Sequence, residues 1–230
     1  MSRVEMYDPA SRSWDRTCAA TGVDREGCHA CVTLGDHIYA LGSMGRQSVN
    51  AVERYDARTN RWELRASMHE SASFQAYAVL GDHIYATGGW GAHDRIANRV
   101  QRYDPARDCW DPVRDMPVDR RFHAAAVLDG CIYVIGGTTS KEVLFSSRVD
   151  RFDPTRDEWE SVMPLAVGRR QLAAVTAGER IYAIGGLKAY RSLATGVEAY
   201  DAASNTWTAC TPMPMARVQF GAAVLRVEEP

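Results

Sequence analysis

Residues 120–159 read RRFHAAAVLDGCIYVIGGTTSKEVLFSSRVDRFDPTRDEW, and this stretch decides the fold. A run of small residues (124–127) meets an Asp-Gly turn, and a β-branched and aromatic run (132–135) then ends on a double glycine. After a polar loop, an alternating segment (149–152) leads through an Asp-Pro turn to Trp159. Short β-type runs separated by turn residues predict four antiparallel strands in this stretch.

The same pattern recurs along the whole chain. Five tryptophans lie 48 or 49 residues apart, at Trp14, Trp62, Trp110, Trp159 and Trp207. An aromatic-Asp pair stands seven residues before each of them, and an Ile-Tyr pair occurs in four of the repeats. In three of those four the pair leads into a double glycine, whereas the first has Gly42-Ser43. Paired glycines permit positive φ and close backbone approach, and the aromatic residues can fill the space between neighbouring sheets. We therefore interpret these marks as structural.

These residues resemble the Kelch repeat, in which one repeat forms one four-stranded blade of a β-propeller. The resemblance covers essentially the whole chain and implies an all-β, Kelch-type β-propeller with four complete blades and a split partial blade. Residues 1–230 are then a single domain. The complete blades are expected at 28–66, 74–113, 122–163 and 171–210, strands c and d of the split blade at 3–18, and a closing strand a at 219–227.

This arrangement gives 19 strands, one short of a five-bladed ring. The C-terminal ending resembles that of the BTB–Kelch (Kelch-like) proteins, whose last strand is the innermost strand of the first blade. The preferred interpretation is a truncated six-bladed ring that lacks about 50–60 residues at its start, together with the BTB and BACK domains that precede it in that family. A five-bladed ring with one short blade is the alternative.

The loops between strands b and c are expected to form the recognition surface. Strands alternate in direction, so these loops and the d–a connections emerge on one face, and the short uniform turns emerge on the other. The b–c loops are longer and all different, which is the usual layout of a binding face on a rigid scaffold. They span 43–51, 90–98, 138–147 and 187–196.

Arginines occupy the same register before strand a in three repeats, where they are expected to ring the mouth of the central channel. Guanidinium groups grip carboxylates bidentately, and exposed Trp, Tyr and Arg dominate binding hot spots. The predicted partner-binding residues are Arg120, Arg121, Arg169, Arg170 and Arg217 at the mouth and Arg46, Trp90, Arg95, Lys141, Tyr190 and Arg191 in the loops. The alternative is that each arginine pairs with a nearby Asp or a carbonyl of the next blade, and that the loop aromatics fold back.

The resemblance implies a protein-interaction module, the substrate-recognition propeller of a Cullin-3 ubiquitin ligase adaptor, which binds an acidic segment of its partner. In that family Cullin-3 is contacted only through the BTB domain, which this chain does not contain. Two alternatives remain open: a small-molecule-binding Kelch enzyme similar to the sialic acid epimerases, and a Kelch protein associated with actin.

No catalytic, cofactor or metal site is predicted. Cys28 and Cys31 form a single CxxC at the start of a strand, where alternation places the two thiols on opposite faces, so a zinc site is not expected. A phosphate-binding loop, a nucleophile elbow and a dinucleotide fingerprint are all missing from the sequence. The protein is therefore not expected to be an enzyme.

Composition excludes further classes of function. The formal net charge is −2, so no global attraction to nucleic acid or anionic membranes is expected. The N-terminal sequence lacks an apolar signal-peptide core, and no apolar run approaches membrane-spanning length. Six cysteines at irregular places in the repeat favour free thiols and a cytoplasmic location.

Overall fold

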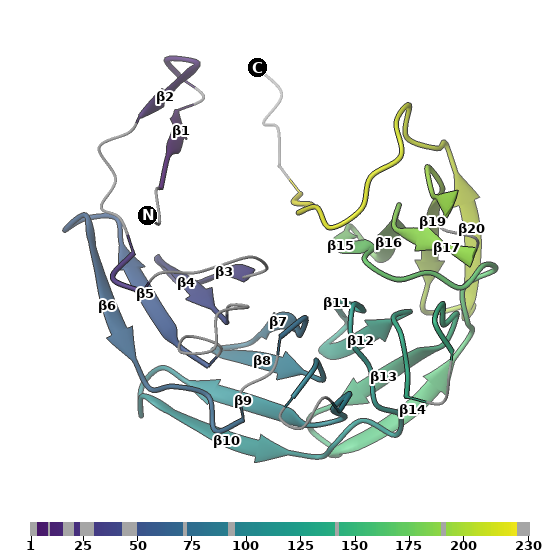
Figure 1. Ribbon diagram of the computed structural model, residues 1–230, viewed down its shortest axis with the longest axis horizontal. Helices are drawn as coiled ribbons and strands as arrows, with labels where there is room; N and C mark the ends of the chain where they lie inside the picture. Colours follow the sequence, from purple (N-terminus) through teal and green to yellow (C-terminus); the bar gives the residue numbers. More distant parts are fainter. Residues whose placement is uncertain are drawn as a thin grey trace.

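The fold is known from a computed structural model, which describes residues 4–8, 10–15, 21–23, 30–42, 50–70, 73–91, 95–140, 143–189 and 192–224. Its strands form four antiparallel sheets of four strands each, arranged side by side around a centre as the blades of a propeller (Figure 1). In every blade the strand order follows the sequence. The all-β propeller with four complete blades and a partial one is thus confirmed.

The four blades have nearly identical strands, joined in the order a, b, c, d. Blade 1 consists of β3 (Ala30–Leu34), β4 (His37–Leu41), β5 (Val52–Asp56) and β6 (Arg61–Arg65). Blade 2 consists of β7 (Ala76–Leu80), β8 (His83–Thr87), β9 (Val100–Asp104) and β10 (Cys109–Val113). Blade 3 consists of β11 (Ala124–Leu128), β12 (Cys131–Ile135), β13 (Val149–Asp153) and β14 (Glu158–Val162). Blade 4 consists of β15 (Ala173–Ala177), β16 (Arg180–Ile184), β19 (Val197–Asp201) and β20 (Thr206–Cys210).

Two short hairpins complete the strands. β1 (Met6–Asp8) pairs with β2 (Ser13–Asp15), and we call this pair the half blade. β17 (Leu187–Lys188) pairs with β18 (Ser192–Leu193) inside the b–c loop of blade 4. Sequence patterns did not predict this second hairpin, because two residues are too few for a periodic signal.

The hydrophobic core lies between blades rather than within them. One cluster joins blades 1 and 2, one joins blades 2 and 3, and one joins blades 3 and 4. In each, the tyrosine of strand b meets the aromatic residue of strand c in the next blade. The ring centroids of Tyr39 and Tyr103, for example, lie 5.8 Å apart in an edge-on arrangement. Such pairs contribute about 0.5–1.5 kcal/mol beyond their burial. They explain why the repeat keeps an aromatic residue at both positions.

The repeated tryptophan ties each blade to the preceding one. The Trp110 indole N–H donates to the carbonyl of Ala66, at 2.9 Å, and Trp159 donates to Arg114, at 3.0 Å. Trp207 repeats the contact with Met163 at 2.8 Å. The tryptophan therefore serves the fold, as its register in the sequence predicts.

In the part of the chain that the structure describes, no strand joins the half blade to the C-terminal segment, and Figure 1 shows the two apart. The expected closing strand at 219–227 is wrong for the part that the structure describes, because residues 219–224 form no strand. A strand a needs a strand b to pair with, and the half blade supplies only strands c and d. Tyr7 and Trp14 are consequently 47% and 64% exposed, whereas the equivalent Trp110 is 2% exposed.

Candidate functional site

The first arginine of each pair is buried and cannot reach a partner. Arg120 is 0% and Arg169 is 3% exposed. Arg120 forms an ion pair with Asp150 in β13, and its Nη1 donates to the carbonyls of Gly136, at 3.1 Å, and Arg148, at 2.8 Å. The prediction that Arg120 and Arg169 contact a partner is therefore wrong, and the alternative of pairing within the fold holds.

Arg169 repeats this arrangement one blade further on. It pairs with Glu198 in β19, and its Nη1 lies 3.2 Å from the carbonyl oxygen of Gly196. Burial lowers the pKa of both Arg120 and Arg169, and the adjacent carboxylate opposes that shift. Arginine starts from so high a pKa that both side chains stay charged, so each forms a buried ion pair, and only its Nε atom has no hydrogen-bond partner among the described residues.

Two residues after each buried arginine, at Phe122 and Gln171, the backbone forms the inner edge of the ring. Four residues in the same register have positive φ: Phe74, Phe122, Gln171 and Gln219. The N–H of Phe122 donates to the carbonyl of Phe74 at 3.2 Å, and that of Gln171 donates to Phe122 at 2.7 Å. The N–H of Gln219 continues the series by donating to the carbonyl of Gln171 at 3.2 Å. We call this series the inner ring. It fixes the path of the chain before each strand a.

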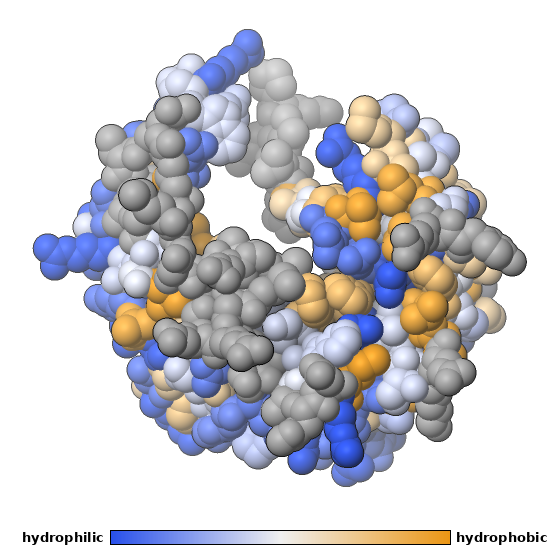
Figure 2. All heavy atoms as spheres, viewed as in Figure 1, coloured by the Kyte–Doolittle hydropathy of each residue, from blue (hydrophilic) through white to orange (hydrophobic). Residues whose placement is uncertain are grey.

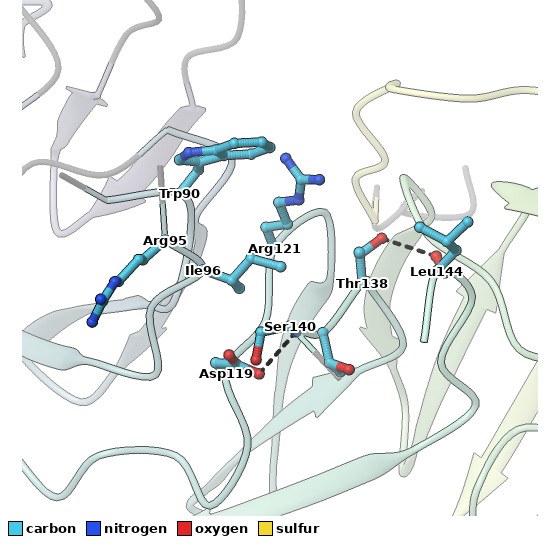
Figure 3. A pocket seen from close by; sticks show the side chains of 9 residues that line it. Trp90, Arg95, Ile96, Asp119, Arg121, Thr138, Ser140 and Leu144 are labelled. Carbon is cyan, nitrogen blue, oxygen red and sulfur yellow. Dashed lines mark hydrogen bonds between the residues drawn. The ribbon is translucent and has the colours of Figure 1, made fainter. Parts of the chain in front are cut away.

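The second arginine of each pair lies against aromatic side chains. Arg121 is half-buried, and its guanidinium carbon lies 3.5 Å from the centroid of the Trp90 ring, in the b–c loop of blade 2 (Figure 3). This is a close cation–π stack across the boundary between blades 2 and 3. Arg121 and Trp90, two of the residues predicted to bind a partner, thus contact each other at this face.

Arg170 takes the equivalent place between blades 3 and 4. Its guanidinium carbon lies 5.6 Å from the ring centroid of Phe122 and 5.3 Å from that of Phe145. The Arg121 guanidinium lies 5.2 Å from the same Phe122 ring. Trp90, Arg121, Phe122, Arg170 and Phe145 thus alternate aromatic and cationic groups, and we call them the aromatic–arginine cluster. Phe122 and Phe145 were not among the predicted binding residues.

A pocket of about 640 Å³ opens beside this cluster, between blades 2 and 3. Its lining comprises Trp90, Arg95, Ile96, Asp119, Arg121, Thr138, Thr139, Ser140 and Leu144. Figure 3 shows Arg121 pointing along the Trp90 side, Asp119 and Ser140 at the opposite end, and Arg95 turned away from Arg121. The Ser140 N–H donates to Asp119 at 3.2 Å, so this carboxylate is held away from the arginine. The pocket therefore has a cationic side and an anionic end.

Of the other predicted binding residues, two are exposed and four lie outside the described part of the chain. Arg95 is exposed at the pocket rim, and Arg217 is exposed at the open end of the ring. Arg46, Lys141, Tyr190 and Arg191 lie outside the described residues. Figure 2 shows an opening at the centre of this face, with hydrophobic residues gathered on the rim formed by the later blades. In the b–c loop of blade 3, Val143 and Leu144 are 45% and 53% exposed.

Within the part of the chain that the structure describes, no group of three His, Cys, Asp or Glu side chains is placed to hold a metal ion. Among the described cysteines, Cys109, Cys131 and Cys210 have free thiols. The described residues also contain no helix of the length and apolarity needed to cross a membrane.

Comparisons with known proteins agree with the repeat. Residues 1–192 match the family model described as Attractin/LZTR1 beta-propeller. Human Kelch-like protein 4 is 43% identical over 61 residues, which are 26% of this chain and 8% of that protein. Kelch-like protein 7 of Rattus norvegicus is 32% identical over 69 residues, 30% of this chain and 11% of that protein.

One solved structure, described as "Structure of YjhT", superposes with a TM-score of 0.73 at 19% identity. The match covers 84% of this chain and 67% of that one. At this identity it supports the fold alone. The matched segments span only about a tenth of the two Kelch-like relatives. Together these likenesses confirm a Kelch-repeat propeller.

Proposed function

Because the chain belongs to the Attractin/LZTR1 β-propeller family, we propose that it is a protein-interaction module that binds an acidic segment of its partner. The b–c loop face carries the contact. The observation behind this proposal is the aromatic–arginine cluster: Arg121 and Arg170 have no ion-pair partner among the described residues, and Arg121 lines a pocket of about 640 Å³. Arginine and tryptophan beside a concave surface are the groups that most often dominate a protein interface.

The binding residues proposed here differ from those read from the sequence. Arg121, Arg170 and Trp90 carry the contact, and Arg95 and Arg217 provide longer-range attraction from exposed positions. The loop residues Arg46, Lys141, Tyr190 and Arg191 remain part of the proposed face on the basis of their register in the sequence. Arg120 and Arg169 are excluded because they are buried.

A fluorescein-labelled peptide of alternating Glu and Leu residues, with its Gln analogue as control, tests this proposal by fluorescence anisotropy. Wild-type protein is expected to bind the Glu peptide, and Arg121→Glu with Arg170→Glu to weaken binding at least tenfold. The matched control is Arg58→Glu, a change at a side chain that is 89% exposed in a c–d turn, on the opposite face. Equal binding by the double variant and the wild type would contradict the assignment of this face.

We further propose that the propeller serves as the substrate-recognition part of a Cullin-3 ubiquitin ligase adaptor. The likeness to the Kelch-like proteins supports this role, and a BTB domain outside these residues would make the Cullin-3 contact. Precipitation of the full-length natural protein from its cells, followed by detection of Cullin-3, tests it. Absence of Cullin-3 would remove the adaptor role and leave the binding face in place.

A further inference from the structure

Arg121 and Arg170 differ from most arginines of the described chain in having no carboxylate partner. Arg99, for example, lies 3.0 Å from Asp115, and Arg107 lies 2.9 Å from Asp111. Among the described residues, no acidic oxygen lies within ion-pair distance of the Arg121 or Arg170 guanidinium. Their Nε atoms, like those of five ion-paired arginines, are shielded from solvent without a hydrogen-bond partner among the described residues. These two side chains are cationic groups with unused donors.

The two charges are close enough to influence each other. Both guanidinium groups approach the Phe122 ring, at 5.2 and 5.6 Å, and aromatic rings flank them on their outer sides. Burial and the charge of Arg170 both lower the pKa of Arg121. Aromatic faces hold the side chains in position but neutralise neither charge. Two neighbouring cations fixed in this way favour a ligand that carries two negative charges.

We propose that Arg121 and Arg170 together bind a phosphoryl group on a side chain of the partner protein. This inference rests on the proposed function and names the anion that the same face prefers. A phosphorylated residue carries close to two negative charges and three acceptor oxygens, whereas a carboxylate carries one charge and two oxygens. The phosphoryl group can therefore accept from both guanidinium groups at once, in the bidentate manner that arginine favours.

The pocket beside Arg121 accommodates the rest of the phosphorylated side chain. Trp90, Ile96 and Leu144 provide apolar lining, and its volume of about 640 Å³ admits an aromatic ring. Asp119 is held at the far end by the Ser140 N–H, so its charge repels an anion from that end and not from the arginines. A ligand with an anionic head and an apolar body thus has one favoured orientation.

Phenyl phosphate and benzoate test the inference, because they share a ring and differ in the charge of the anionic group. Titration calorimetry at pH 7.5 is expected to give phenyl phosphate an affinity at least tenfold above that of benzoate. Arg121→Gln and Arg170→Gln should each reduce phenyl phosphate binding about tenfold, while Arg58→Gln leaves it unchanged. Binding should also weaken below about pH 6, where the phosphate dianion takes up a proton and becomes a monoanion.

Three outcomes would overturn it: equal affinity for the two probes, unchanged phosphate binding in the Gln variants, or inorganic phosphate binding as tightly as phenyl phosphate. The last would indicate an adventitious ion only. If the Glu-Leu peptide still binds through Arg121 and Arg170 but phenyl phosphate shows no preference, the phosphoryl inference fails and the proposed function stands. If the peptide fails to bind while phenyl phosphate binds as expected, the proposed function fails instead.

Discussion

Adjacent arginines in the linker before strand a have different roles because they point in opposite directions. Arg120 enters the sheet of blade 3 and Arg121 stacks on Trp90 of blade 2. Consecutive side chains of an extended segment alternate between faces, so only one of each pair can lie at the mouth. The same separation recurs at Arg169 and Arg170, where the first is buried and the second lies between aromatic rings.

Replacing Arg120 by Met is expected to destabilise the protein by about 3–5 kcal/mol, because it leaves Asp150 buried with part of its partners removed. Arg148 still reaches Asp150 through its Nε at 2.8 Å, which favours the lower end of that range. Urea unfolding followed by tryptophan fluorescence measures the change. The double variant Arg120→Met, Asp150→Leu should recover much of the loss. A double variant as unstable as the single one would contradict the account of a buried charge.

The buried His123 is expected to make the folded protein less stable at acid pH. Its Nε2 lies 2.9 Å from the Thr87 hydroxyl, and burial, aided by the charge of Arg120, lowers its pKa to about 3. Near pH 6.5 the His123 side chain takes up a proton in the unfolded state but not in the folded state. The free energy of unfolding is therefore unaffected by His123 above pH 6.5 and decreases as the pH falls toward 3. The loss should reach roughly 4 kcal/mol at the acid end.

Urea midpoints measured from pH 7.5 to pH 4 check this expectation. His123→Asn removes the titrating group and should therefore flatten the pH dependence over that window, although its stability at neutral pH is lower. Other carboxylates titrate in both proteins, so the difference between the two slopes isolates His123. Parallel slopes would show that His123 is not the source.

The face of the candidate site could be predicted from the sequence, but the side-chain register within it could not. Trp90 is a loop aromatic that the repeat does not require, and it does line the pocket. Arg120 and Arg121 were both predicted to contact a partner, because the linker is not a regular strand and its alternation has no fixed starting point that would identify the buried side chain. One sequence signal could have identified the buried arginines. Strand c carries an acid after its first valine at Glu53, Asp150 and Glu198, and a buried acid needs a cationic partner such as Arg120 or Arg169.

At the scale of the element, the double glycine ends strand b because the neighbouring linker approaches it closely. Gly137 has a φ of 100°, and a Cβ there would lie 2.8 Å from the carbonyl oxygen of Arg121 and 2.9 Å from the Cβ of His123. Gly130, in the a–b turn of the same blade, has a φ of 72° but would meet no atom within 4 Å. An alanine at Gly130 would therefore suffer backbone strain alone, whereas an alanine at Gly137 would suffer both backbone strain and steric clash.

Alanine at Gly137 is expected to cost at least 3 kcal/mol, whereas alanine at Gly130 should cost about 1–2 kcal/mol from left-handed strain alone. Thermal unfolding of the two single variants provides the comparison. Gly137→Ala should also weaken peptide binding, because the displaced linker carries Arg121. Equal costs at the two positions would indicate that the close approach contributes nothing.

The four blades were predictable because each strand is short, bounded by turn residues and repeated at a constant spacing. Val149, Phe152 and Trp159 recur in equivalent places, so an error in one repeat is corrected by the others. The closing strand was not predictable in the same way. Residues 219–224 have the sequence of a strand a, but a strand forms only where a neighbour offers hydrogen bonds, and that information lies outside the segment itself.

For the whole molecule, the open ring predicts uneven hydrogen exchange. The half blade packs few apolar groups, whereas β12 of blade 3 is fully buried. Amides of residues 6–15 should therefore exchange within seconds, and those of 131–135 should stay protected for hours. Exchange followed by mass spectrometry of peptic fragments measures both. Protection of 6–15 comparable to that of blade 3 would mean that the ring closes in solution.

The inner ring has a consequence for how this protein can change over time. The four residues that form it are joined through their main-chain N–H and carbonyl groups, and the side chains at those positions are Phe, Phe, Gln and Gln. Mutation can thus exchange the groups around the mouth without breaking the bonds that hold the blades in a circle. A lineage that inherits this scaffold is free to adopt new targets while keeping the same architecture.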